Sequence, residues 1–130
     1  MSDTASGPPT WFDLTVADAD AVRDFYASVC GWRAEPHDMG EYSDFTMHAP
    51  SGEAVTGICH ARGVNAALPP VWIPYFRVPS LTEAVERAVA GGGTVLDHRP
   101  HPKAEDQGFA VISDPAGAVC AVWAKGPDEG

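Results

Sequence analysis

Histidine is the residue type in this chain whose spacing could bind a metal ion or transfer a proton. His98 and His101 have a spacing found in pairs of metal ligands, but prolines interrupt their segment and no third ligand is near. We therefore interpret that segment as a solvated loop. His37 and Asp38 are adjacent, and neighbouring loop residues rarely face one another, so they do not indicate a base with its orienting carboxylate. His60 closes an apolar segment, which suits a hydrogen-bonded structural histidine or a residue at the rim of a ligand cavity.

The three cysteines, Cys30, Cys59 and Cys120, are far apart and form no CxxC pair. Each lies in an apolar run, where cysteine usually packs as a small hydrophobic side chain, although a catalytic thiol remains an alternative. An odd number of separated cysteines is typical of a reducing compartment. We therefore expect a cytoplasmic protein with buried free thiols and no zinc site.

Large aromatic side chains offer the clearest binding chemistry. Flat rings provide stacking area at little entropic cost, and the polar tips of Tyr and Trp can orient a ligand. Core packing explains any single ring equally well, but several rings on strands favour a binding cavity. Asp13, two residues beyond Trp11 on the same strand face, would add a carboxylate that pairs with a cation or accepts from a phenol. The candidate ligand-binding residues are Trp11, Asp13, Phe45, His60, Trp72, Tyr75, Phe109 and Trp123.

The first of these residues lie in a strand that leads into a helix. Alternation over Trp11–Val16 predicts a strand with Phe12, Leu14 and Val16 on one face. From Ala19 the apolar spacing changes to three and four residues, and the stripe Ala19, Val22, Phe25/Tyr26 and Val29 predicts an amphipathic helix. Asp18 is the expected N-cap, and Gly31 is expected to end the helix.

The rest of the first half is expected to form three strands. They cover Trp32–Glu35, which Pro36 stops, then Tyr42–His48 and Ala54–His60, where Gly57 indicates a bulge or a close backbone approach. A loop at His37–Glu41 and a turn at Pro50–Gly52 separate them. Arg62–Pro70 has no periodicity and is interpreted as a linker.

The second half repeats this order 62 positions later, so that Val16 corresponds to Val78 and Gly31 to Gly93. Ser80 and Glu83 form the sequence pattern of a capping box, and Gly91–Gly93 should end the helix. Strands are expected at Val71–Val78, Thr94–Asp97, Phe109–Ser113 and Val119–Trp123. Pro74 places the first of these strands at an edge or a bulge, and His98–Gln107 is expected to be a polar loop. Two β-α-β-β-β modules, 11–60 and 71–124, are therefore expected in one domain at 11–124, between tails at 1–10 and 125–130.

Composition limits the class of partner. The 130 residues hold 8 Lys and Arg against 18 Asp and Glu, a net charge of −10. This balance argues against nucleic acid and an anionic membrane surface, and it is compatible with a neutral or cationic small molecule. Met1–Thr10 has no signal-peptide pattern, and no apolar run approaches membrane-spanning length.

Three motifs resemble the vicinal oxygen chelate superfamily, which includes glyoxalase I, extradiol dioxygenases and bleomycin-resistance proteins. They are DLTVAD with the following Phe25-Tyr26, the Gly31-Trp32 pair, and FAVISDPAGAV from Phe109 to Val119. Strands that open with Trp make the chain most similar to the glyoxalase-like group. The resemblance implies an α+β fold in which each module curls its strands into a cup with its helix outside, often completed by a second chain. We therefore expect a homodimer.

The resemblance also implies where a metal ion would bind in the enzymes of the superfamily. Three of the four positions are occupied here by Trp11, Ile73 and Ala121, and the fourth falls near Cys59, where no carboxylate follows Glu53. A tight metal site needs imidazole or carboxylate ligands, so we expect no metal, no cofactor and no catalytic residue. The expected function is to sequester an aromatic natural product or antibiotic, as drug-binding members do. A metal-dependent lyase, isomerase or dioxygenase and a protein-binding domain are the alternatives.

Overall fold

The strand–helix–strand–strand–strand order occurs twice in the computed structural model, which describes residues 11–125. Two units result, one of residues 11–72 (the first unit) and one that begins at Ile73 (the second unit). The first contains β1 (Trp11–Val16), α1 (Ala19–Cys30), β2 (Arg33–Asp38), β3 (Ser43–His48), β4 (Ala54–His60) and the short helix η1 (Gly63–Asn65). The second contains β5 (Ile73–Arg77), α2 (Leu81–Ala90), β6 (Thr94–His101), β7 (Ala104–Ser113) and β8 (Val119–Ala124). The expected tail at 1–10 lies outside the described residues, as does the expected tail at 125–130 except for Lys125.

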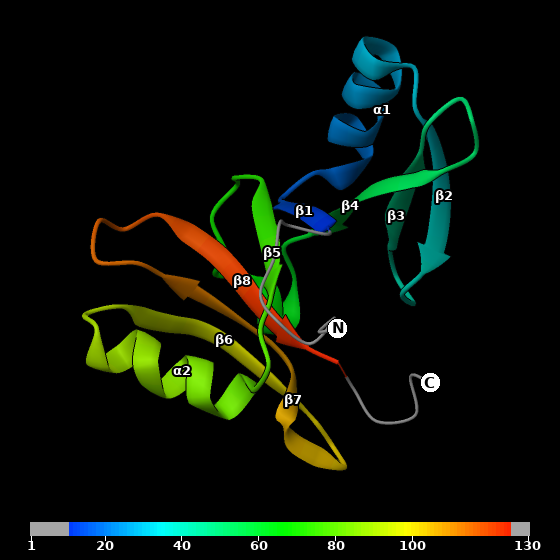
Figure 1. Cartoon of the computed structure of the whole chain (residues 1–130). Helices are drawn as coiled ribbons and strands as arrows, with labels where there is room; N and C mark the ends of the chain where they lie inside the picture. Colours follow the sequence, from blue (N-terminus) through cyan, green and yellow to red (C-terminus); the bar gives the residue numbers. More distant parts are fainter. Residues whose placement is uncertain (1–10, 126–130) are drawn as a thin grey trace. The chain divides into compact units, whose positions relative to one another are not determined.

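The strands have the same arrangement within each unit (Figure 1). In the first unit the order is β2-β3-β4-β1, where β1 runs parallel to β4 and the other pairs are antiparallel. In the second unit the order is β6-β7-β8-β5, where β5 runs parallel to β8 and the other pairs are antiparallel. The predicted α+β class, with two modules of mixed strands and one helix each, is confirmed.

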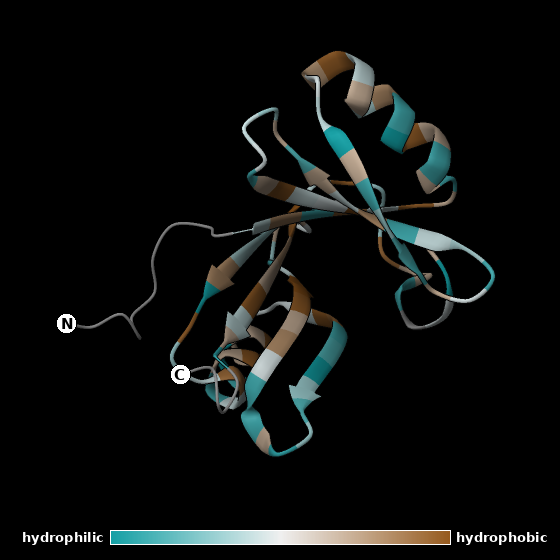
Figure 2. Cartoon of the chain, turned by 90° about the vertical axis from the view of Figure 1, so that its right-hand side faces the viewer, coloured by the Kyte–Doolittle hydropathy of each residue, from teal (hydrophilic) through white to brown (hydrophobic). Residues whose placement is uncertain are grey.

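Helix α1 begins and ends where the sequence predicts. The Asp18 carboxylate accepts a hydrogen bond from the Ala21 N–H at 3.1 Å, and Gly31 adopts a left-handed conformation, φ 72°, that ends the helix. Its packed side meets a core of Ala19, Phe45, Met47 and Ile58. The predicted stripe is only partly covered, because Phe25 and Val29 stay more than half exposed while Val22 and Tyr26 pack inward. Figure 2 shows hydrophobic and hydrophilic residues on the same helix.

Helix α2 forms half of the predicted capping box. The Ser80 hydroxyl accepts from the Glu83 N–H at 3.2 Å, but the Glu83 carboxylate accepts from the Arg87 guanidinium instead of returning to Ser80. The helix packs on a core made of Leu81, Ala110, Val122 and Ala124. No helix within residues 11–125 is long and apolar enough to cross a membrane.

Two predicted loops are too long, because some of their residues continue strands. Strand β2 runs through Pro36 to Asp38, and it can do so because it is the outer strand of its unit, with one side free of ladder hydrogen bonds. Likewise β6 extends to His101 and β7 starts at Ala104, so the expected loop at His98–Gln107 is a hairpin. Register shifts at Val95/Asp97 and at Pro100/His101 accommodate its irregular residues.

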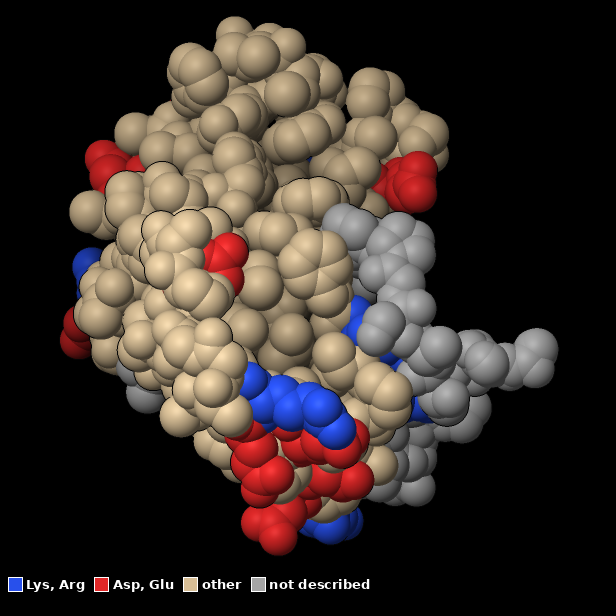
Figure 3. Space-filling view, turned by 60° about the vertical axis from the view of Figure 1, so that its left-hand side comes forward, with Lys and Arg blue, Asp and Glu red and all other residues tan. Residues whose placement is uncertain are grey.

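Charged side chains are unevenly distributed on the surface. In the view of Figure 3, acidic and basic side chains lie next to one another in one area, and uncharged residues form most of the rest. The net charge of −10 therefore does not describe the charge at any particular site.

Candidate functional site

The face of the second unit opposite α2 carries a row of aromatic and basic side chains. Because α2 packs on Ala110 and Val122, the residues that alternate with them point to the opposite face. The strand register then places four residues side by side across four strands: Arg77 of β5 pairs with Trp123 of β8, Trp123 with Phe109 of β7, and Phe109 with Arg99 of β6. We call this surface, with Tyr75 of the adjacent row, the ring face.

The side chains of the ring face contact one another. The Arg77 Cζ lies 5.3 Å from the centre of the Trp123 ring, and the Arg99 Cζ lies 5.9 Å from that of Phe109. Both distances suit cation–π interactions. The Tyr75 and Phe109 rings are 5.9 Å apart and tilted. All five side chains are neither buried nor fully exposed, so a ligand could reach their outer surfaces.

The adjacent row explains how the rings meet. Tyr75 pairs with Ala121, Ala121 with Val111, and Val111 with Asp97. Ala121 is fully buried, and its methyl group leaves room for the Tyr75 and Phe109 rings to contact each other across β8. Three residues chosen from the sequence, Tyr75, Phe109 and Trp123, therefore share one face.

The corresponding face of the first unit is organised around a carboxylate instead. The Trp11 indole N–H donates to Asp13 Oδ1 at 2.6 Å, which holds both side chains on the face away from the buried Ile58. Gly57 is the register partner of Asp13, and a Cβ atom there would lie 2.5 Å from Asp13 Oδ1. The predicted close approach at Gly57 is thus made by a side chain, while the register shift lies between Met47 and His48. We call the surface of Trp11, Asp13, Gly57 and Cys59 the carboxylate face.

The thiols have different environments. Burial raises the pKa of Cys59 to about 12, and the Asp13 and Asp44 carboxylates act in the same direction. Burial also raises the pKa of Cys120, with a smaller contribution from Asp114. Both thiols therefore stay protonated and unreactive at neutral pH. Cys30 is exposed, so the expectation that all three thiols are buried is wrong for it.

Two candidate residues of the first unit occupy interior positions. The His60 backbone N–H donates to Asp44 Oδ1 at 2.8 Å. The His60 imidazole Nδ1 lies 2.9 Å from the Ser43 carbonyl oxygen, and because that oxygen can only accept, Nδ1 is the donor. His60 is 7% exposed, in keeping with the structural alternative. Phe45 is 4% exposed and belongs to the core under α1. The Arg23 guanidinium lies over its ring, 4.7 Å from the ring centre.

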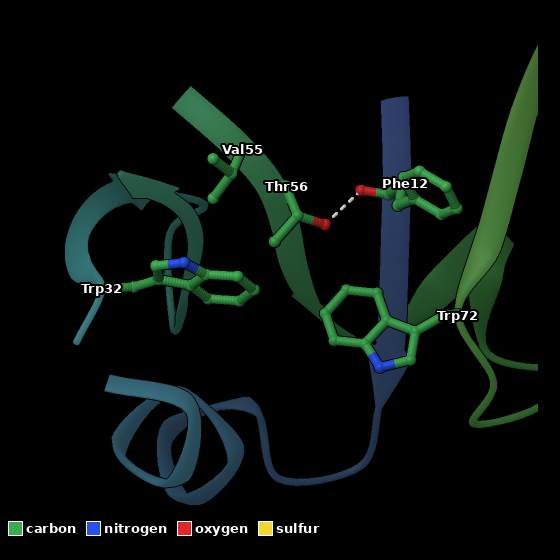
Figure 4. Close-up of a pocket in the computed structure, with 5 residues that line it drawn as sticks. All are labelled: Phe12, Trp32, Val55, Thr56 and Trp72. Atoms are coloured by element: carbon green, nitrogen blue, oxygen red, sulfur yellow. Dashed lines mark hydrogen bonds between the residues drawn. The ribbon is translucent and has the colours of Figure 1, made fainter. Parts of the chain in front are cut away.

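Trp72 lines an apolar hollow of about 310 Å³ in the first unit (Figure 4). Its indole N–H donates to the Tyr26 hydroxyl at 3.2 Å, and the Trp32 ring stacks on Tyr26 at 5.9 Å. The sequence interpretation missed the other four lining residues: Phe12, Trp32, Val55 and Thr56. Trp32 could have been noticed in the sequence as a second large ring, but the strand irregularity at Val55 and Thr56 could not.

His37 and His101, two other histidines considered in the sequence, make local contacts. His37 Nε2 lies 2.8 Å from Thr46 Oγ1, whereas Asp38 accepts from the Gly40 N–H, so these neighbours do not act together. His101 Nδ1 accepts from the Lys103 N–H in the hairpin turn, and His98 is exposed. No pair of base and orienting carboxylate results from these positions.

The positions that bind metal in the enzymes of the resembled superfamily do not fit a metal ion here. The Trp11 indole nitrogen can only donate and already contacts Asp13, while Ile73 and Ala121 are apolar and at most 1% exposed. Within residues 11–125, no three His, Cys, Asp or Glu side chains form a group that could hold a metal ion. The absence of a metal cofactor in the working protein stays a prediction.

Similar proteins are known at the level of sequence. A family model described as a glyoxalase-like domain matches residues 10–123. CFP32 of Mycobacterium tuberculosis, which is named as a glyoxylase, is 33% identical over 125 residues, covering 94% of this chain and 47% of CFP32. The anthracycline biosynthesis protein DnrV of Streptomyces peucetius is 30% identical over 142 residues, covering 100% of this chain and 51% of DnrV. The chain thus spans about half the length of the curated relatives it matches.

Solved structures share the fold at low sequence identity. Methylmalonyl-CoA epimerase from Mycobacterium tuberculosis has a TM-score of 0.53 and 15% identity, and the match covers 98% of this chain and 93% of the epimerase. A glyoxalase/bleomycin resistance protein/dioxygenase superfamily member from Vibrio splendidus has a TM-score of 0.54 and 12% identity, with 88% and 97% covered. At these identities the likeness concerns the fold alone.

Proposed function

Because this chain belongs to the glyoxalase-like domain family, we propose that it binds and sequesters a planar aromatic small molecule without using a metal ion. The family match confirms the resemblance to the vicinal oxygen chelate superfamily, and the solved structures have its fold. The observation that carries the proposal is the ring face, where Tyr75, Phe109 and Trp123 lie together with partly exposed rings.

The rings of this face could supply enough affinity for sequestration. A well-placed ring pair contributes about 0.5–1.5 kcal/mol beyond area burial. Two or three such pairs, with general burial of a drug-sized ligand, reach roughly −8 kcal/mol, which corresponds to a micromolar Kd. Stoichiometric binding at this affinity lowers the free concentration of a compound without any chemical step.

The names of relatives support an aromatic ligand. DnrV is named for the biosynthesis of anthracyclines, which are planar aromatic natural products. A binding protein for such a compound would protect the cell that makes or meets it. We extend this to the present chain as a proposal, because the match covers only half of DnrV.

An enzyme is the alternative, since CFP32 is named as a glyoxylase. The chemistry of the donor set weighs against a metal-dependent reaction, because Trp11, Ile73 and Ala121 offer no lone pair to a metal. Metal analysis of the purified protein separates the two functions. We expect no stoichiometric divalent ion and no shift in Tm with Zn²⁺, Ni²⁺, Mn²⁺ or Fe²⁺, and one equivalent of bound metal would favour the enzyme.

Ligand binding is tested by calorimetric titration with the carboxamide derivative of anthraquinone, a planar tricyclic compound. Trp123→Ala should weaken binding tenfold or more while the circular dichroism spectrum stays unchanged. Trp32→Ala is the matched control, since Trp32 lies in the hollow of the first unit. Equal binding by the parent and Trp123→Ala would show that the Trp123 ring is packing only.

The proposed assembly is a homodimer, because superfamily members often complete their cups with a second chain. A ring face covered by a second chain would also expose less apolar surface to water than a ring face in a single chain. Sedimentation at micromolar concentration tests this assembly, and a species of one chain only would contradict it.

A further inference from the structure

The row of the ring face has a guanidinium group at each end and two rings between them. Arg77 and Arg99 lie on β5 and β6, the two ends of the strand order within the second unit, and Trp123 and Phe109 lie on β8 and β7. Three strand spacings separate the two arginines, so their backbones are roughly 14 Å apart. A planar aromatic compound that lies on the rings would therefore place its edge substituents next to a guanidinium.

The two arginines differ in how their charge is balanced. Arg99 Nε lies 3.0 Å from Asp97 Oδ1. Arg77 has no carboxylate at ion-pair distance within residues 11–125, and its contact is with the Trp123 ring. Among the partly buried arginines, which are Arg23, Arg77 and Arg99, Arg77 is alone in this respect in the described part of the chain. A partly desolvated cation without a counter-ion favours an anion that arrives with the ligand.

The Arg77 side chain is also oriented for such an anion. Stacking of its guanidinium beside the Trp123 ring restricts the rotamers of the side chain before any ligand binds. A guanidinium presents its N–H donors in a planar fork that matches a carboxylate or a similar pair of oxygens. An aromatic acid can stack its ring on Trp123 and Phe109 while its anionic group reaches the fork.

From these observations we infer that the ring face selects planar aromatic ligands that carry an anionic group, and that Arg77 is the residue that determines this specificity. The inference rests on the proposed function and names its ligand class. It differs from the expectation of a neutral or cationic ligand, which followed from the net charge of the whole chain. Charges beyond about 8–10 Å are screened at physiological salt, so the net charge of the whole chain does not determine the charge at the ring face.

The test compares the carboxylate, carboxamide and aminomethyl derivatives of anthraquinone, which differ mainly in charge. Calorimetric titration at low and at physiological salt should give the carboxylate a Kd at least tenfold lower than that of the carboxamide, and the aminomethyl compound the weakest binding. Arg77→Gln should reduce the preference for the carboxylate to less than threefold. Arg77→Lys, which keeps the charge but loses the planar fork, should retain part of the preference.

The matched control is Arg87→Gln on α2, where an exposed arginine pairs with Glu83 outside the ring face. It should bind all three compounds like the parent. Equal affinity of the parent for carboxylate and carboxamide would overturn the inference while leaving the proposed function intact. An equal loss of the preference for the carboxylate in Arg77→Gln and Arg87→Gln would also overturn the inference. Binding of none of the three compounds would contradict the proposed function itself.

Discussion

The two units use the same strand and helix order, yet the faces opposite their helices differ. Under α1 and α2 both units have hydrophobic cores, made of Ala19, Phe45, Met47 and Ile58 in the first. On the opposite sides, the carboxylate face is centred on Asp13, whereas the ring face places two rings between two arginines. Packing against a helix restricts only the residues of one strand face, so the residues that alternate with them are free to diverge.

The two units also depend on glycine in different ways. At Gly57 an added Cβ would meet the tip of a side chain, Asp13 Oδ1. At Gly108, which has φ 107°, it would meet the backbone of the hairpin, namely the Arg99 carbonyl oxygen and the His101 nitrogen. Backbone atoms held in a strand ladder cannot move aside as a side chain can, so the second position should tolerate less change.

The largest effect is expected for Gly108→Ala, which should lower the free energy of unfolding by about 2–4 kcal/mol through the contact and the left-handed backbone. Urea denaturation measures this change. Gly117→Ala is the matched control, because Gly117 also has a positive φ, 90°, but no atom within 4 Å of the added Cβ. If Gly108→Ala loses no more stability than Gly117→Ala, the hairpin can relax, and the contrast between the two units would weaken.

Gly57→Ala should cost less, about 1–2 kcal/mol, because the Asp13 carboxylate can rotate away at the expense of its hydrogen bond with Trp11. A double-mutant cycle with Asp13→Ala isolates this contribution. In the Asp13→Ala background, the further substitution Gly57→Ala should be nearly neutral. Equal costs in both backgrounds would mean that Gly57 is needed for another reason than the position of Asp13.

The protonated Cys59 thiol predicts an alkaline limit to stability. Since the folded state raises its pKa from 9.0 to about 12, the contribution is fully present below pH 9 and is lost as the pH rises toward 12. Between pH 8 and pH 10, the parent should therefore lose about 1 kcal/mol more stability than Cys59→Ser. Parallel pH profiles of the parent and Cys59→Ser would contradict the raised pKa of Cys59.

The three thiols should also differ in reactivity. With a disulfide reagent at pH 8, the exposed Cys30 should react first.

The smallest effect is expected on the outer strand of the first unit. A hydrogen bond from His48 at 2.7 Å lowers the pKa of the exposed Glu35 below its usual 4.5. A lowered pKa stabilises the fold above pH 4.5 and loses that effect as the pH falls through the folded value. The Tm of the parent should thus fall slightly more between pH 5 and pH 3 than that of Glu35→Gln. Identical Tm profiles would mean that solvent screens this pair completely.

Local chemistry in the sequence determined the helices and their ends. Asp18, Ser80 and Gly31 act on backbone groups within four residues of themselves, so their roles at α1 and α2 could be predicted without the fold. The strand at Ala54–His60 was likewise predicted with its observed bounds, and the motifs indicated the superfamily.

Tertiary structure alone decided what lies beside what across the strands. The row from Arg77 through Trp123 and Phe109 to Arg99 depends on three registers between segments up to 46 positions apart in the chain, which no local pattern specifies. The arginines were therefore missed although the rings were found. Strand β2 continued through Pro36 only because it became an outer strand, and that position is a property of the sheet. Hydrogen bonds between distant strands set both outcomes, whereas hydrogen bonds within one turn set the helix ends.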